Sequence, residues 1–183
     1  MTPAVGFRPV TPADHPVLAE FLVGEDWPFH HHRRLSAATV ADWLATGAYA
    51  LPQALAFCIE HDGRLLGLIH LDDIEDIDDG EPLLNIRLTA AARGQGVGRA
   101  AVRWICEHAF GRWPRLQRIA AETRTDNLAM RHVLRACGFA KEAHHRQAWT
   151  SADGTRHDCI GYALLRADWE RGMVTPVEWD DAG

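Results

Sequence analysis

The sequence lacks the long apolar runs and repeats that mark membrane or fibrous proteins. No stretch approaches the roughly 18 consecutive apolar residues of a membrane span. The first ten residues, MTPAVGFRPV, also lack the basic stretch and apolar run of a secretory signal. With 183 residues, of which 47% are hydrophobic and 24% charged, the chain has an ordinary globular composition. We therefore expect one domain in the cytoplasm, with no membrane partner.

Cysteine is scarce and has no motif spacing. None of the cysteines forms a CxxC pair, and they lie far apart, at Cys58, Cys106, Cys137 and Cys159. We expect them to be reduced and to pack as small hydrophobic residues. Three consecutive histidines (30–32) do not change this view, because adjacent side chains on an extended backbone cannot all face one metal, and no H-E-x-x-H motif is present. We expect no metal site.

Positive charge is not in excess. Against 19 Lys and Arg the chain has 25 Asp and Glu, a formal charge of −6, which argues against a nucleic-acid partner. Seven of these acids lie in the ten positions 72–81 (DDIEDIDDGE), so the rest of the chain is close to neutral. This acidic segment is either a solvated connection or a field that attracts a cationic ligand. We favour the connection, with Asp72 or Asp73 close to a substrate.

Hydrophobic periodicity and turn residues predict a mixed α+β domain. Strands are expected at 5–10, 54–60, 64–71, 82–88, 118–122, 141–150 and 157–165. Helices are expected at 12–23, 36–46, 98–110 and between Asn127 and Gly138. The Asp62-Gly63 pair between two apolar runs predicts a hairpin. Since no element is evident from Arg171 onward, we expect a domain at 1–170 and a tail at 171–183.

Glycines alternate in the segment 93–98 (RGQGVG), directly before the third predicted helix. Glycine lets backbone N–H groups turn toward an anion, and a helix N-terminus adds partial positive charge. Arg93 and Arg99 flank the segment and add full charges. A dinucleotide fold would need G-x-G-x-x-G at the end of the first strand of a parallel crossover, whereas here a hairpin precedes G-x-G-x-G. The segment therefore predicts a phosphate cradle of another kind.

This segment resembles the [Q/R]-x-x-G-x-[G/A] signature of the GCN5-related N-acetyltransferase (GNAT) family, which Arg93, Gly96 and Gly98 match. The family's Asn-x-x-Ala…Gly-Phe segment also has a counterpart, from Asn127 to Gly138-Phe139. The resemblance covers most of the chain. Its C-terminal part, with the hairpin at 153–154 and the segment YALLRADW, is similar to the branch that acetylates ribosomal-protein N-termini.

The resemblance implies a mostly antiparallel sheet flanked by helices, with acetyl-CoA as co-substrate. It implies direct acetyl transfer, in a ternary complex, to a primary amine on a small molecule, an antibiotic or a protein N-terminus. Homodimers are common among the proteins it resembles, while the sequence itself leaves the oligomeric state open. The implied cofactor-binding residues are Leu88, Thr89, Arg93, Gly94, Gln95, Gly96, Val97, Gly98, Arg99, Asn127 and Arg131.

Glu122 is the candidate general base. An amine with a pKa of ~10.4 must lose a proton before it can attack a thioester. Glu122 ends the predicted strand, five residues before Asn127, where the resembling enzymes carry a catalytic glutamate. The alternative is a structural carboxylate paired with Arg118 or Arg124.

The oxyanion donor implied by the resemblance is a backbone N–H near Leu88 or Thr89. The family's tyrosine acid, seven residues after the asparagine, is replaced by Leu134. Tyr162 and His132 are weak substitutes, and a thiol pKa of ~8.5 lets thiolate leave without an acid. The missing tyrosine also motivates the alternative of an acyl-CoA-binding module or sensor without catalysis.

The acceptor pocket is implied at the loop between the first two helices, 24–34 (GEDWPFHHHRR). The residues expected to line it are Trp27, Phe29, His30, His31 and Asp72. The alternative is a surface loop with Trp27 and Phe29 packed in the core.

Overall fold

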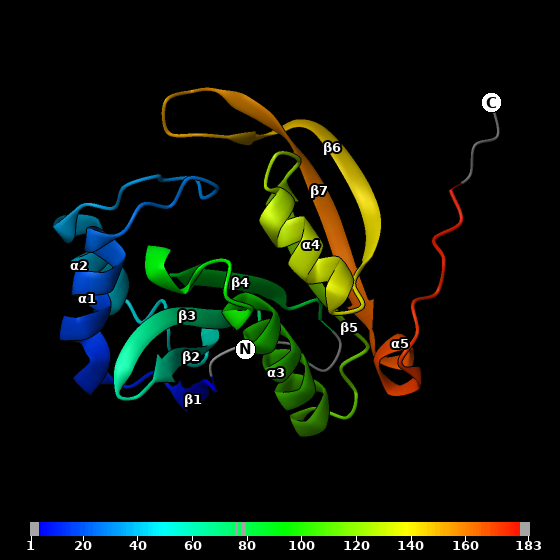
Figure 1. Ribbon diagram of the computed structural model, residues 1–183, viewed down its shortest axis with the longest axis horizontal. Helices are drawn as coiled ribbons and strands as arrows, with labels where there is room; N and C mark the ends of the chain where they lie inside the picture. The colour runs from blue at the N-terminus through cyan, green and yellow to red at the C-terminus, as the bar shows by residue number, and fades with distance from the viewer. Residues whose placement is uncertain (1–3, 76, 78–79, 180–183) are drawn as a thin grey trace.

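A seven-stranded sheet with the order β1-β2-β3-β4-β5-β7-β6 forms the centre of the molecule (Figure 1). The computed structural model describes residues 4–75, 77 and 80–179. The strands are β1 (Gly6–Pro9), β2 (Ala54–His61), β3 (Arg64–Asp72), β4 (Leu83–Leu88), β5 (Arg118–Arg124), β6 (Ala140–Thr150) and β7 (Arg156–Leu165). Neighbouring strands are antiparallel except β4 and β5, which are parallel. The expectation of a mixed, mostly antiparallel sheet is confirmed.

The turn and the helix cap that the local sequence predicts are present in the structure. Asp62 and Gly63 join β2 to β3 with φ values of 48° and 72°, as a two-residue hairpin turn requires. Ser36 caps α2 (Ala37–Ala45) by accepting a hydrogen bond from the backbone N–H of Thr39 at 3.0 Å. These contacts involve neighbours in sequence, so propensity alone could indicate them.

Helices cover both faces of the sheet. On one face, α1 (His15–Gly24) and α2 enclose a core that includes Cys58 and Leu68. On the other face, α3 (Val97–Arg112) and α4 (Leu128–Ala136) pack over a larger core with residues of every strand from β2 to β7 except β6. Cys58, Cys106 and Cys159 are buried and all four cysteines are free, as expected. No helix within the described ranges is long and apolar enough to cross a membrane.

Most elements begin or end within three residues of the expected positions, and one helix was not expected. β5 continues two residues beyond Glu122, because Thr123 and Arg124 pair with β7. α3 starts at Val97, inside the glycine-rich segment. A further short helix, α5 (Arg166–Arg171), follows β7, and buried Asp168 accepts hydrogen bonds from the Thr175 backbone and hydroxyl. Helices this short depend on tertiary contacts rather than on a periodic pattern.

The acidic segment is anchored by its apolar residues. Ile74 and Ile77 are buried in the larger core, with 6% and 7% of their surface exposed. Glu81 forms an ion pair with Arg118 at 3.1 Å. Asp76, Asp78 and Asp79 lie outside the described residues. The described part thus behaves as a connection that packs on the core.

The parallel strands β4 and β5 separate after one pairing. Leu83 is opposite Ala120, and the Ala120 N–H donates to the carbonyl of Pro82 at 3.0 Å. No further pairing joins the described residues of these strands. We call the diverging part, from Leu84 to Leu88 on β4 and from Ala121 to Arg124 on β5, the β4–β5 split.

Candidate functional site

The β4–β5 split leaves backbone hydrogen-bonding groups of β4 without a strand partner. The Thr89 N–H donates to the carbonyl of Leu66 on the β3 side at 2.8 Å. Because hydrogen bonds alternate along an antiparallel pair, and Leu88 is the next residue along the same register, the Leu88 N–H points away from β3 and toward the split. Of the two expected oxyanion donors, Thr89 is therefore already bonded and Leu88 is the one that faces the split.

The glycine-rich segment lies between the end of β4 and the start of α3. Gly94 and Gly96 have φ values of 72° and 82°, in the left-handed region that glycine adopts at low cost. Gly96 is the N-cap of α3, so backbone N–H groups of the first turn are free to meet an anion. Val97 is buried and Arg99 is exposed on that first turn. Gln95 turns away, since its amide donates to the carbonyl of Ala91 at 2.5 Å.

Glycine at position 98 is explained by close packing and not by its backbone conformation. A β-carbon at this position would lie 3.5 Å from the Leu88 side chain and 3.8 Å from the Val133 side chain. The third glycine therefore sits where α3 approaches both β4 and α4.

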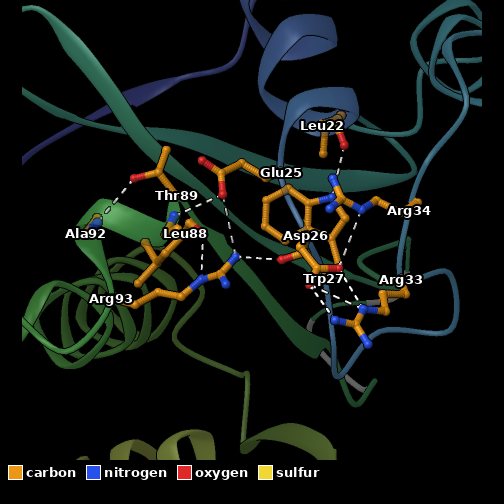
Figure 2. Close-up of polar contacts among 11 residues, drawn as sticks. Leu22, Glu25, Asp26, Trp27, Arg33, Arg34, Leu88, Thr89, Ala92 and Arg93 are labelled. Atoms are coloured by element: carbon orange, nitrogen blue, oxygen red, sulfur yellow. Dashed lines mark hydrogen bonds and ion pairs between the residues drawn. The ribbon is translucent and has the colours of Figure 1, made fainter.

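Arg93 holds the 24–34 loop against the end of β4 (Figure 2). Its Nε donates to the carbonyl of Leu88 at 3.0 Å, and its Nη2 donates to the carbonyl of Asp26 at 2.8 Å. The guanidinium also lies 5.6 Å from the centre of the Trp27 ring. Glu25 adds a second tie by accepting the Ala90 N–H at 3.0 Å. The Arg93 side chain is thus engaged with the loop, not directed at the glycine-rich segment.

The other end of the 24–34 loop contacts β5 and the β6–β7 hairpin. Arg124 on β5 donates to the carbonyl of Pro28 at 3.3 Å, and its guanidinium lies 5.4 Å from the Phe29 ring. His31 accepts the Ala152 N–H on its carbonyl at 3.1 Å. The loop therefore crosses the β4–β5 split on the face that α1 and α2 cover.

The residues of the 24–34 loop that were expected to line the acceptor pocket differ in burial. Trp27 is 1% exposed, and its indole N–H donates to the carbonyl of Leu22, so it packs in the core as the alternative reading had it. Phe29 and His30 are partly buried, and His31 is exposed with Nδ1 at 2.7 Å from the Thr150 carbonyl.

Glu122 is exposed on the face crossed by the loop, because alternate residues of a strand share a face and Glu122 lies two residues from Arg124 on β5. Neither expected partner binds it: Arg118 pairs with Glu142 at 2.6 Å, and Arg124 pairs with Asp126 at 2.6 Å. The Cys159 thiol donates to a Glu122 carboxylate oxygen at 4.0 Å. Burial and this carboxylate raise the pKa of the Cys159 thiol to about 11.

Asn127 and Arg131 connect α4 to its surroundings. Asn127 accepts the Met130 N–H at 3.2 Å as the N-cap of α4, and its amide donates to Thr123 at 2.9 Å. Arg131 donates to the Thr125 carbonyl at 2.6 Å and to the Tyr162 hydroxyl at 3.3 Å. Leu134 is fully buried, so the position of the family's tyrosine is filled by a core residue.

Sequence reasoning missed a buried polar cluster on β3 and β4. Arg87 and His70 are 9% and 5% exposed, on the same face as Trp27. His30 lies beside them, and burial together with the charges of Arg87 and His70 lowers its pKa to about 3. The signal was present in the strand 83–88 (LLNIRL), where polar residues alternate with apolar ones. No group of three metal-binding side chains is found among residues 4–75, 77 and 80–179.

Comparison with known proteins agrees with this geometry. Residues 5–140 match the family model described as an acetyltransferase (GNAT) domain. The curated protein "Putative ribosomal N-acetyltransferase YdaF" of Bacillus subtilis is 26% identical over 176 residues, which cover 91% of this chain and 93% of that protein.

Solved structures share the fold. RimJ of Mycobacterium smegmatis, in complex with CoA-disulfide, aligns with a TM-score of 0.75 and 22% identity over 91% of this chain and 84% of that chain. Spermidine N-acetyltransferase of Vibrio cholerae, in complex with CoA and spermine, aligns with a TM-score of 0.74 and 17% identity over 91% and 98% of the two chains. Because the family model spans most of the sequence and the split sheet and glycine-rich segment are in place, the chain belongs to the GNAT family of acetyltransferases.

Proposed function

We propose that this protein transfers an acetyl group from acetyl-CoA directly to a primary amine within a ternary complex. The observation that carries the proposal is the Leu88 N–H, which faces the β4–β5 split beside the glycine-rich segment. A thioester lying in the split would meet this donor from one side, and an amine under the 24–34 loop would approach from the other.

The glycine-rich segment is suited to the pyrophosphate of acetyl-CoA. Free N–H groups at the start of α3 and the exposed Arg99 supply the positive charge. Unpaired backbone groups of β4 can then pair with the amides of the pantetheine arm, as a further strand would. Three further expected residues hydrogen-bond to protein groups and so have positioning roles in this scheme. Arg93 positions the 24–34 loop, and Asn127 and Arg131 position α4.

Glu122 takes up the proton of the acceptor amine, directly or through water. The neutral nitrogen attacks the thioester carbon, and the Leu88 N–H stabilises the oxyanion. The C–S bond then breaks to release CoA thiolate, and the nitrogen loses its second proton to water as the amide forms. A thiol pKa of ~8.5 makes that thiolate an adequate leaving group, so the core position of Leu134 is compatible with turnover.

The acceptor class is a small amine or a peptide N-terminus. Relatives named for ribosomal N-acetylation and for spermidine N-acetylation support both kinds. We propose action in the cytoplasm through a single domain at residues 1–170, with a homodimer as the expected assembly.

Calorimetry with acetyl-CoA and an assay of thiol release over a panel of amines test this proposal. Glu122→Gln should lower kcat by about 100-fold, because general base catalysis contributes about that much, and should leave acetyl-CoA affinity unchanged. Glu20→Gln, at an exposed site on α1, is the matched control. Absence of acetyl-CoA binding would refute the proposal. Binding without turnover of any amine would favour the non-catalytic acyl-CoA-binding module.

A further inference from the structure

Arg87 is a buried cation without a counter-charge. Its Nε and Nη1 are buried and have no hydrogen-bond partner, and no carboxylate of the described residues forms an ion pair with it. Burial lowers the pKa of this guanidinium, with the Tyr49 hydroxyl as the one opposing influence. An unpaired buried donor costs about 1–3 kcal/mol, and more when it is charged, so a ligand that accepts hydrogen bonds from Arg87 would recover this free energy.

The neighbouring arginines on this face are already paired. Arg124 binds Asp126 through two hydrogen bonds, at 2.9 and 2.6 Å. Arg93 binds backbone carbonyls of Leu88 and Asp26. Arg87 is therefore the cation of this group with free donors.

The surroundings of Arg87 hold the guanidinium in place. It lies 5.0 Å from the centre of the Trp27 ring, a buried side chain that is itself fixed by its bond to Leu22. His70 on β3 lies opposite Asn85, two residues before Arg87, and is also buried; its Nε2 lies 3.4 Å from an Asp72 carboxylate oxygen, while its Nδ1 has no partner. Buried nitrogen atoms without partners thus lie on two adjacent strands, on the face of the sheet that the 24–34 loop crosses.

We infer that Arg87, with His70 and His30 beside it, is a carboxylate-binding subsite, and that the acceptor is a primary amine that also carries a carboxylate. The inference rests on the proposed function and names its substrate class. The guanidinium would bind the carboxylate through parallel N–H donors, while the amine would lie toward Glu122 and the Leu88 N–H.

The phosphates of the co-substrate are excluded as occupants by the sheet itself. Side chains alternate along β4, so Leu84, Ile86 and Leu88 pack toward α3 and Arg87 projects to the opposite face. The glycine-rich segment leads into α3, on the other side from Arg87. A carboxylate also matches one free guanidinium in charge, whereas a phosphate dianion would need a second cation.

Matched acceptors provide the first test. An L-amino acid and its α-amide have nearly the same shape, but only the amino acid carries a carboxylate. Tripeptides with Glu or Gln at the second position test whether a side chain of a peptide can supply this carboxylate. With the wild-type protein and acetyl-CoA we expect kcat/KM to be at least about 10-fold higher for the carboxylate member of the preferred pair, as a charged hydrogen bond implies. Equal rates, or a preference for the amides, would overturn the inference while leaving the proposed function intact.

The variants Arg87→Gln and Arg87→Lys localise the effect. Arg87→Gln should abolish the preference through KM and leave acetyl-CoA affinity unchanged, and Arg87→Lys should retain part of it. Arg64→Gln, at an exposed arginine of the β2–β3 hairpin, is the control. A preference that survives in Arg87→Gln would assign the carboxylate to another residue.

A binding test requires no turnover. Titration with acetate, and with acetamide as its neutral isostere, can be followed on the imidazole NMR signals of His30 and His70. Acetate should shift these signals in the wild type and in Arg87→Lys but not in Arg87→Gln, and acetamide should leave them in place. If acetate moves neither signal, the subsite does not exist, whatever the outcome of the acetyl-CoA assay. Inorganic phosphate, tested in the same way, should compete less well than acetate.

Discussion

Replacing Arg93 separates two roles that the family signature and the structure assign to it. The signature places this residue among those that bind acetyl-CoA, whereas the structure bonds its guanidinium to the carbonyls of Leu88 and Asp26. Arg93→Gln keeps a polar side chain but removes both bonds and the stacking on Trp27. The change should therefore loosen the 24–34 loop rather than the cofactor site.

The expected magnitude follows from the contacts. Each hydrogen bond from a charged donor is worth about 1.5–3 kcal/mol when buried. The Arg93 side chain is 38% exposed, so water replaces part of that interaction. We expect unfolding in urea to require about 1–2 kcal/mol less free energy, and limited proteolysis to cut the loop faster in the variant.

Acetyl-CoA affinity decides between the two roles. In Arg93→Gln the calorimetric Kd should rise by less than about 3-fold, whereas Arg99→Gln, on the first turn of α3, should weaken binding by about 3- to 10-fold and leave stability unchanged. The reasoning is refuted if Arg93→Gln weakens acetyl-CoA binding 10-fold or more without a loss of stability or a change in loop cleavage.

Two further predictions concern pH and the acidic segment. The pKa of His30 is lowered to about 3, so near pH ~6.5 the unfolded chain takes up a proton at this residue and the folded chain does not. The free energy of unfolding should therefore fall as the pH drops below ~6.5, by up to about 2 kcal/mol at pH 5. His30→Gln should flatten the urea midpoints between pH 7.5 and 5, and the exposed His32→Gln should not; superimposable wild-type and His30→Gln profiles would contradict this. In the acidic segment, Ile77→Ala should cost about 2–4 kcal/mol, since its side chain is buried in the core. Asp73→Asn, at a position with φ of 57° that asparagine tolerates, should change neither stability nor acceptor KM, and a 10-fold rise in KM would instead support the electrostatic role.

Local patterns account for most of what the sequence predicts. The Asp62-Gly63 turn, the Ser36 cap and the Asn127 cap each depend on residues within four positions, and all are present. α5 carries no such pattern, because its few residues are held by contacts such as that between Asp168 and Thr175. It could not be inferred from periodicity.

The candidate site depends on contacts between distant parts of the chain. Arg93 reaches Asp26 across 67 positions, so its engagement with the 24–34 loop leaves no local trace in the sequence. Arg87 was missed although it left a local trace, because polar and apolar residues alternate along its strand and so indicate a sheet face with polar side chains. What the alternation does not reveal is that the face is buried and that the guanidinium lacks a partner there.

The single pairing between β4 and β5 divides the sheet into two ribbons, β1–β4 and β5–β7–β6. Their backbones pair where Leu83 lies opposite Ala120, at one end of the split, and the 24–34 loop forms hydrogen bonds to both ribbons at the other end. The width available to a thioester therefore depends on a segment that also meets the acceptor. Any acceptor that changes the affinity for acetyl-CoA through this loop must have its own affinity changed by acetyl-CoA by the same factor.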